Sequence, residues 1–168
     1  GIKVIWLMPI NPISTTKSKG PLGSYYAVSD YEKVNPEFGT EEDFRDLVEK
    51  AHDLGIYIIL DWVPGHTGWD HIWIRDHPEF YLKNDKGEIT DPINHQTGKS
   101  WGWTDVADLD YNNKKMQRAM TNAMKYWIDE FDIDGFRIDV AQGLVKNMLM
   151  PDNPIRFQIT EDMSPRQV

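Results

Sequence analysis

The sequence contains no cysteine, which excludes disulfides, thiol nucleophiles and cysteine metal sites. It has no apolar run long enough to span a membrane and no signal-peptide pattern. Positive charge is scarce: 18 Lys and Arg stand against 27 Asp and Glu, which leaves a formal net charge of -9. This balance argues against nucleic acid and anionic membranes as partners. None of these absences identifies a cellular compartment, so localisation stays open.

The composition is that of an ordinary globular domain, with 168 residues of which 40% are hydrophobic and 27% are charged. Residues 3–8 form an apolar run that predicts a buried strand. Thr40 and Asp43 form a capping-box pattern that predicts the start of a helix, and Gly55 marks its end. Residues 56–60 predict the next buried strand. Together these segments indicate a βαβ unit and a parallel sheet.

A second unit of the same kind follows in the C-terminal half. Asn113 is a plausible helix cap, and a Met-rich apolar face runs to about residue 133 and is typical of a core helix. Residues 135–140 predict a strand, residues 144–149 allow a short helix, and residues 155–160 predict another strand. Residues 67–105 show little periodicity, and loops of that length in compact domains are usually functional.

Polar side chains follow the predicted strands where each strand ends, namely Asp61 and His66, then Arg137 and Asp139, then Glu161. In parallel α/β folds this edge carries the chemistry. Carboxylates on neighbouring strands can lie roughly 5 Å apart, which is the separation of a retaining glycosidase. Asp139 then suits the nucleophile, with Arg137 pointing to the same side, and Glu161 suits the acid/base. A purely structural Arg–Asp pair is an equal alternative for Arg137 and Asp139 alone.

Four segments of the chain resemble the α-amylase family, glycoside hydrolase family 13. They are LDWVPGH at residues 60–66, GFRIDVA at 135–141, SYYAVSDY at 24–31 with NPEFGT at 35–40, and VADLD at 106–110. The resemblance implies an α/β fold that is a segment of a (β/α)8 barrel, covering about strands two to five. Residues 1–66 and 106–168 would form the partial barrel. Residues 67–105 would form a loop-rich insert, domain B, after the third barrel strand.

The resemblance also implies roles for individual residues. Asp139 would be the nucleophile and Arg137 its ion-pair partner. Tyr26 would stack under the sugar at the cleaved subsite, which His66 and Asp61 would bind and shape. The function implied is retaining hydrolysis of α-1,4-glucans, such as starch and maltooligosaccharides, through a covalent glycosyl-Asp intermediate.

Glu161 is assigned as the acid/base because residues 159–162 resemble the end of the fifth barrel strand in branching-enzyme-like members. Gly65 departs from the family, which usually has an Asn there that in many members helps hold structural calcium. Asp105 and Asp108 remain oxygen donors of the right kind, but we expect no required cofactor. A complete barrel needs about 250 residues, and the motif for a third catalytic carboxylate is missing. We therefore expect the isolated segment to be inactive.

Two other functions remain open for the same motifs: a transglycosylase or isomerase, and a non-catalytic carbohydrate-binding remnant. A weaker alternative is a metal hydrolase that would use His66, Asp61, His71, His77 and His95, although their spacings match no helical metal pair. The insert's tryptophans either line a sugar cleft or form the insert's own core. They are Trp69, Trp73, Trp101 and Trp103.

Overall fold

A computed structural model of the chain describes residues 1–94 and 97–141. Its elements in chain order are β1 (Val4–Leu7), α1 (Glu41–Asp53), β2 (Tyr57–Trp62), β3 (His66–Gly68), α2 (Ile72–Asp76), the 3-10 helix η1 (Pro78–Phe80), β4 (Val106–Asp108), α3 (Lys114–Phe131) and β5 (Gly135–Ile138). The predicted helix at 144–149, the predicted strand at 155–160 and Glu161 lie outside the described residues. Within the described part, no helix is both long and apolar enough to cross a membrane.

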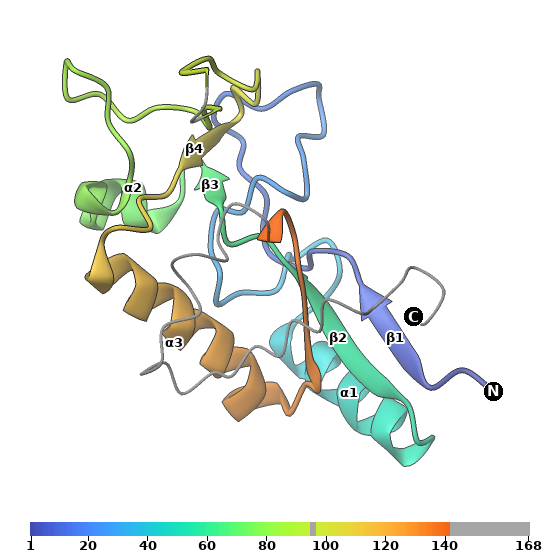
Figure 1. Cartoon of the computed structure of the whole chain (residues 1–168). Helices are drawn as coiled ribbons and strands as arrows, with labels where there is room; N and C mark the ends of the chain where they lie inside the picture. The colour runs from blue at the N-terminus through green and yellow to red at the C-terminus, as the bar shows by residue number, and fades with distance from the viewer. Residues whose placement is uncertain (95–96, 142–168) are drawn as a thin grey trace.

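Three parallel strands form the main sheet in the order β1-β2-β5 (Figure 1). Helix α1 connects β1 to β2, and α3 leads into β5, so both predicted strand–helix–strand units are present. The register aligns Leu7 with Leu60 and Asp61 with Arg137. The carboxyl ends of the strands therefore meet at one edge of the sheet, and the loops that carry β3 and β4 rise above that edge (Figure 1).

Strand β1 differs from its prediction as a buried strand. Val4, Ile5 and Trp6 are 46%, 37% and 48% exposed, whereas Ile58 and Leu60 on β2 are nearly inaccessible. The apolar run correctly indicates a strand, but burial depends on neighbours. β1 lies at the edge of the sheet, where β2 is its only partner among the described strands.

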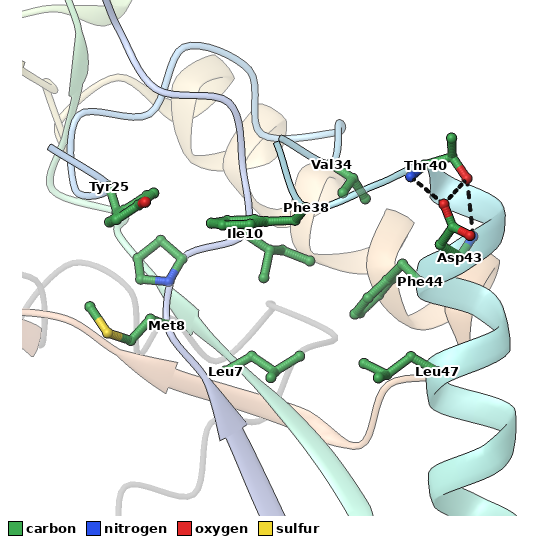
Figure 2. A pocket seen from close by; sticks show the side chains of 11 residues that line it. Leu7, Met8, Ile10, Tyr25, Val34, Phe38, Thr40, Asp43, Phe44 and Leu47 are labelled. Atoms are coloured by element: carbon green, nitrogen blue, oxygen red, sulfur yellow. Dashed lines mark hydrogen bonds between the residues drawn. The ribbon is translucent and has the colours of Figure 1, made fainter. Parts of the chain in front are cut away.

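The helices begin where their caps predict. Thr40 Oγ1 accepts the N–H of Asp43 at 3.1 Å, and Asp43 Oδ2 accepts the N–H of Thr40 at 2.8 Å (Figure 2). Asn113 Oδ1 caps α3 by accepting two backbone N–H groups. The apolar face of α3 packs against α1, with the rings of Phe44 and Trp127 meeting edge to face at 5.5 Å. The methionines of this face, Met116, Met120 and Met124, are fully buried, so this stripe belongs to the core.

An apolar cavity of about 470 Å³ lies between the end of β1, the loop before α1 and the first turns of α1 (Figure 2). Leu7, Met8, Phe38 and Leu47 are among the side chains that line it. Asp43 is the one carboxylate among its lining residues, and that group is bonded to Thr40. The cavity therefore offers apolar contact rather than chemistry.

The insert is joined to the sheet by an antiparallel pair, β3 with β4, in which His66 faces Asp108. The loop after β1, at residues 14–19, contacts the insert at several points. Asp70 Oδ2 accepts the N–H groups of Thr15 and Thr16 at 2.9 and 3.2 Å, and Lys17 Nζ lies 3.4 Å from the ring centroid of Trp69. The division into residues 67–105 and the rest stays a prediction.

Candidate active site

A single guanidinium joins the ends of β2 and β5. Arg137 Nη1 donates to both carboxylate oxygens of Asp61, at 2.9 and 3.0 Å, and to Oδ1 of Asp139 at 2.8 Å. The Asp61 side chain is 0% exposed, while those of Arg137 and Asp139 are 41% and 17% exposed. The predicted Arg137–Asp139 pair is therefore present, and Arg137 is shared with a second, buried carboxylate.

Asp139 stands in a sharp turn directly after β5. Its N–H donates to the carbonyl of Trp62 at 2.8 Å, which continues the ladder one residue beyond the strand. Val140 has φ of 49°, in the left-handed region that β-branched residues rarely adopt. The sequence predicted a strand through Val140, but this turn ends β5 at Ile138. The turn leaves Asp139 at the end of the sheet.

Tyr26 and His66 reach the same place from two other segments. The Tyr26 hydroxyl donates to Asp61 Oδ2 at 3.3 Å, and the Tyr26 carbonyl lies 3.1 Å from His66 Nε2. A carbonyl oxygen only accepts, so Nε2 of His66 carries the hydrogen and Nδ1 of the neutral ring is an acceptor. The buried Tyr31 hydroxyl lies 2.8 and 3.1 Å from the carbonyl oxygens of Val63 and His66, which fixes this stretch of backbone.

A cavity of about 500 Å³ opens beside these groups. The lining comes from the 19–26 loop, from the strand ends and from the end of the insert. It includes Lys19, Tyr26, His66, Trp103, Asp105, Val106, Asp139 and Val140. Three segments that are distant in the sequence therefore line one cavity, with two carboxylates, an ammonium group, an imidazole and a phenol on its walls. A cavity of this size accommodates a small ligand.

Burial and charge set the protonation states of the site. Burial raises the pKa of Asp61, although the hydrogen bond and the positive charge of Arg137 oppose the rise. Burial, aided by the charge of Asp61, also raises the pKa of the Tyr26 hydroxyl, which therefore stays protonated and donates. Burial lowers the pKa of His66, so its ring is neutral near pH 7. The pKa of Arg137 is raised because its contacts with two carboxylates outweigh the effect of burial.

Five of the six predicted site residues come together at this edge: Tyr26, Asp61, His66, Arg137 and Asp139. The sixth, Glu161, lies outside the described residues. Sequence reasoning missed Lys19, which lines the cavity and places Nζ 3.3 Å from Oδ1 of Asp105. The loop around Lys19 is rich in Ser, Thr, Lys and Gly, and nothing in that pattern distinguishes this lysine from a solvated one.

One of the two carboxylates named as calcium donors, and the backbone carbonyl of Gly65, already have partners. The Asp105 carboxylate pairs with Lys19, and the Gly65 carbonyl accepts the N–H of Leu109 at 3.1 Å. Residues 1–94 and 97–141 contain no group of three or more His, Asp or Glu side chains arranged to hold a metal ion. The expectation that structural calcium is doubtful stays a prediction.

The histidines of the metal-hydrolase alternative also have other roles in the structure. His71 is buried, and its Nδ1 accepts the N–H of Trp73 at the start of α2. His77 stacks on Phe80, with ring centroids 4.6 Å apart. His95 lies outside the described residues. The described histidines therefore serve as a cap and as packing groups, and they do not converge with His66.

The tryptophans of the insert divide between core and surface. Trp69 and Trp73 are partly buried and pack against the hydrophobic core. Trp101 and Trp103 are 55% and 38% exposed, and their rings stack with centroids 6.1 Å apart. Trp103 lines the cavity, and its role in lining a sugar cleft stays a prediction.

The parallel sheet that carries this polar cluster has relatives among known proteins. The family model described as the alpha-amylase catalytic domain matches residues 1–167. The chain belongs to the α-amylase catalytic-domain family. The predicted resemblance is thereby confirmed, and so is the predicted fold class, a segment of a (β/α)8 barrel. Membership rests on nearly the whole chain rather than on the four motifs alone.

Individual members of the α-amylase family show how much of a complete protein this chain represents. Maltase 1 from Drosophila virilis is 32% identical over 92% of this chain and 28% of its own length. An oligo-1,6-glucosidase from Heyndrickxia coagulans is 31% identical over 90% of this chain and 31% of its own length. The crystal structure of an α-amylase from Lactobacillus plantarum matches with a TM-score of 0.76 at 40% identity, covering 84% of this chain and 31% of that one. The chain therefore spans less than a third of the length of each of these proteins.

Proposed function

We propose that this chain carries the nucleophile side of the active site of a retaining glycosidase that cleaves α-1,4-glucans such as maltooligosaccharides. The observation that carries the proposal is the Arg137 guanidinium, which holds Asp139 through Oδ1 beside a cavity walled by Tyr26 and His66. Because Oδ1 is occupied by this hydrogen bond, Oδ2 is the oxygen positioned to attack. The proposal needs no cofactor.

In the first step, Asp139 Oδ2 attacks the anomeric carbon of the glucosyl unit, and the bond to the leaving oxygen breaks. The leaving oxygen takes its proton from a general acid, for which the sequence offers Glu161. Water then gives up a proton to that carboxylate and attacks the same carbon, which releases Asp139 and retains the configuration. The positive charge of Arg137 stays beside the carboxylate throughout both steps.

The remaining groups bind and position the sugar. The ring of Tyr26 offers an aromatic face to the sugar in the cavity. The acceptor Nδ1 of neutral His66 can take a hydrogen bond from a sugar hydroxyl. Asp61 is a positioning residue in this proposal, because its side chain has no exposed surface and it bonds both Arg137 and Tyr26.

The test is to trap the glycosyl intermediate on the protein, expressed with whatever flanking sequence its gene encodes. A fluorinated glucosyl fluoride should add the mass of one sugar to the peptide that contains Asp139. Asp139→Asn should reduce turnover of maltooligosaccharides by at least about 10⁴-fold. Asp85→Asn, an exposed carboxylate of the insert, is the matched control. Undiminished turnover by Asp139→Asn, or a label on another residue, would overturn the nucleophile assignment.

A second candidate differs in the linkage that is cleaved. A relative named oligo-1,6-glucosidase is as similar to this chain as the relative named maltase, at 31% and 32% identity. Comparing initial rates on maltose and isomaltose separates the two. The products must also be analysed, because transfer to a sugar acceptor instead of water would leave longer oligosaccharides and identify a transglycosylase.

A further inference from the structure

Two exposed indoles lie stacked beside the cavity that holds Asp139. Trp101 and Trp103 have ring centroids 6.1 Å apart and ring planes 23° apart. They remain 55% and 38% exposed, although large aromatic side chains are usually buried in proteins. Exposed apolar surface in such a cluster marks an interaction site when it adjoins a functional region. The question is which ligand this surface fits.

Trp103 links the pair directly to the candidate active site. Its ring meets the His66 ring edge to face, with centroids 5.9 Å apart. Trp103, His66 and Asp139 line the same cavity. Trp101 stacks on Trp103 and is not among the residues that line the cavity. The aromatic surface is thus continuous from the cavity wall to the outside.

The turn that carries the two indoles is held in place by several contacts. Gly102, between them, has φ of 77°, in the left-handed region that glycine adopts readily. Lys19 Nζ donates to the Gly102 carbonyl at 2.6 Å, and Ser100 Oγ accepts the Gly102 N–H at 2.8 Å. The Trp101 N–H donates to the carbonyl of Pro92 at 3.0 Å. A surface fixed in this way loses little entropy when a ligand binds.

The other two tryptophans of the insert, Trp69 and Trp73, have the contacts of structural residues. One face of the Trp69 ring is covered by Lys17, and Trp69 Nε1 donates to the carbonyl of Thr104 at 3.0 Å. Trp73 packs against Tyr31 and Phe80, with ring centroids 5.2 and 5.5 Å away. Trp101 and Trp103 stack on each other and keep much of their surface open, so their arrangement differs from that of packing residues.

We propose that Trp101 and Trp103 form an accessory sugar-binding platform for the part of an α-glucan chain that extends out of the cavity. The inference rests on the proposed glycosidase function and specifies its substrate class: oligosaccharides longer than a disaccharide. A glucosyl ring has an apolar face of CH groups, and an indole offers the matching flat surface. One sugar occupies the cavity beside Asp139, and the next sugars along the chain lie over Trp103 and then Trp101.

Binding can be measured without turnover in the Asp139→Asn background, in the polypeptide expressed with its native flanking sequence. Calorimetric titrations with maltose and with maltohexaose give the dissociation constant for each chain length. Adding Trp101→Ala should weaken maltohexaose binding about tenfold, the size of one aromatic stacking contact. The fold-loss of affinity for maltose in Trp101→Ala should be at least about five times smaller than that for maltohexaose. Trp101→Phe, which keeps an aromatic ring, should restore most of the affinity for maltohexaose.

Tyr57→Ala is the matched control, because Tyr57 is 56% exposed and begins β2, at the end of the strand away from Asp61. Equal losses for maltose and maltohexaose in Trp101→Ala, or no loss for either, would overturn the platform. A wild-type protein that neither binds nor cleaves any α-glucan would instead refute the proposed function itself. Circular dichroism of each variant separates loss of binding from loss of folding.

Discussion

Replacing Arg137 with Met should destabilise the protein chiefly by leaving the buried carboxylate of Asp61 without a cation. Three hydrogen bonds disappear, two to Asp61 and one to Asp139. Among the described residues, Asp61 then keeps only the 3.3 Å contact from Tyr26. Breaking a fully buried ion pair costs about 3–5 kcal/mol. The Arg137 side chain is 41% exposed, so water already screens part of this interaction. We therefore expect a loss of about 2–3 kcal/mol at pH 7.

A double-mutant cycle measures that quantity directly. The free energy of unfolding is obtained from urea titrations of wild type, Arg137→Met, Asp61→Asn and the double variant. If the unpaired carboxylate causes the loss, Arg137→Met should cost only about 1 kcal/mol when residue 61 is Asn. The melting temperature of the single variant should fall by roughly 5–10 °C. An Arg137→Met penalty that is equal in both backgrounds would refute the reasoning.

Acidification supplies an independent check on the same variant. The pKa of Asp61 already lies above its ordinary value of 3.8, and removing Arg137 removes the main group that opposes the rise. The folded state of the variant then binds the proton more tightly than the unfolded state does. The loss of unfolding free energy in Arg137→Met should be complete above the raised pKa of Asp61. It should shrink as the pH falls toward 3.8, the ordinary pKa of an aspartate. A penalty that grows on acidification would contradict the assignment.

Two further predictions concern residues outside the site. Thr40→Ala removes the side-chain cap of α1 and should lower the free energy of unfolding by about 1 kcal/mol in urea, while Thr97→Ala in the insert should not. His71 is buried and its pKa is lowered to about 3, so below its ordinary value of 6.5 only the unfolded state gains the proton and stability falls with pH. His71→Asn keeps an acceptor for the α2 cap and should remove about 2 kcal/mol of the stability loss between pH 7 and pH 5. Parallel stability–pH curves for the two proteins would count against this role of His71.

The features that sequence predicted well depend on local spacing. The capping box of α1 joins residues three apart, and the Arg137–Asp139 pair joins residues two apart at the end of β5. Such contacts follow from the geometry of a helix turn or a strand, whatever surrounds them. The Met-rich face of α3 was predictable for the same reason, because its 3.6-residue period is fixed by the helix.

The features that sequence could not provide depend on register and on neighbours. Arg137 bonds Asp61 because β5 pairs with β2 in a register that aligns these two residues, and no local pattern encodes that alignment. The exposure of β1 depends on which strands flank it. In the insert, the absence of any periodicity left Trp69 and Trp101 indistinguishable, although one is covered by a lysine and the other is open.

The left-handed backbone of Val140 has a consequence for anyone who engineers this protein. A β-branched residue at φ of 49° holds about 1–3 kcal/mol of strain. A selection for heat resistance would therefore favour Val140→Gly, since glycine adopts this conformation without penalty. The same change would loosen the backbone immediately beside Asp139. If Asp139 is the nucleophile proposed above, directed evolution should then find a more stable but slower variant at the position next to it.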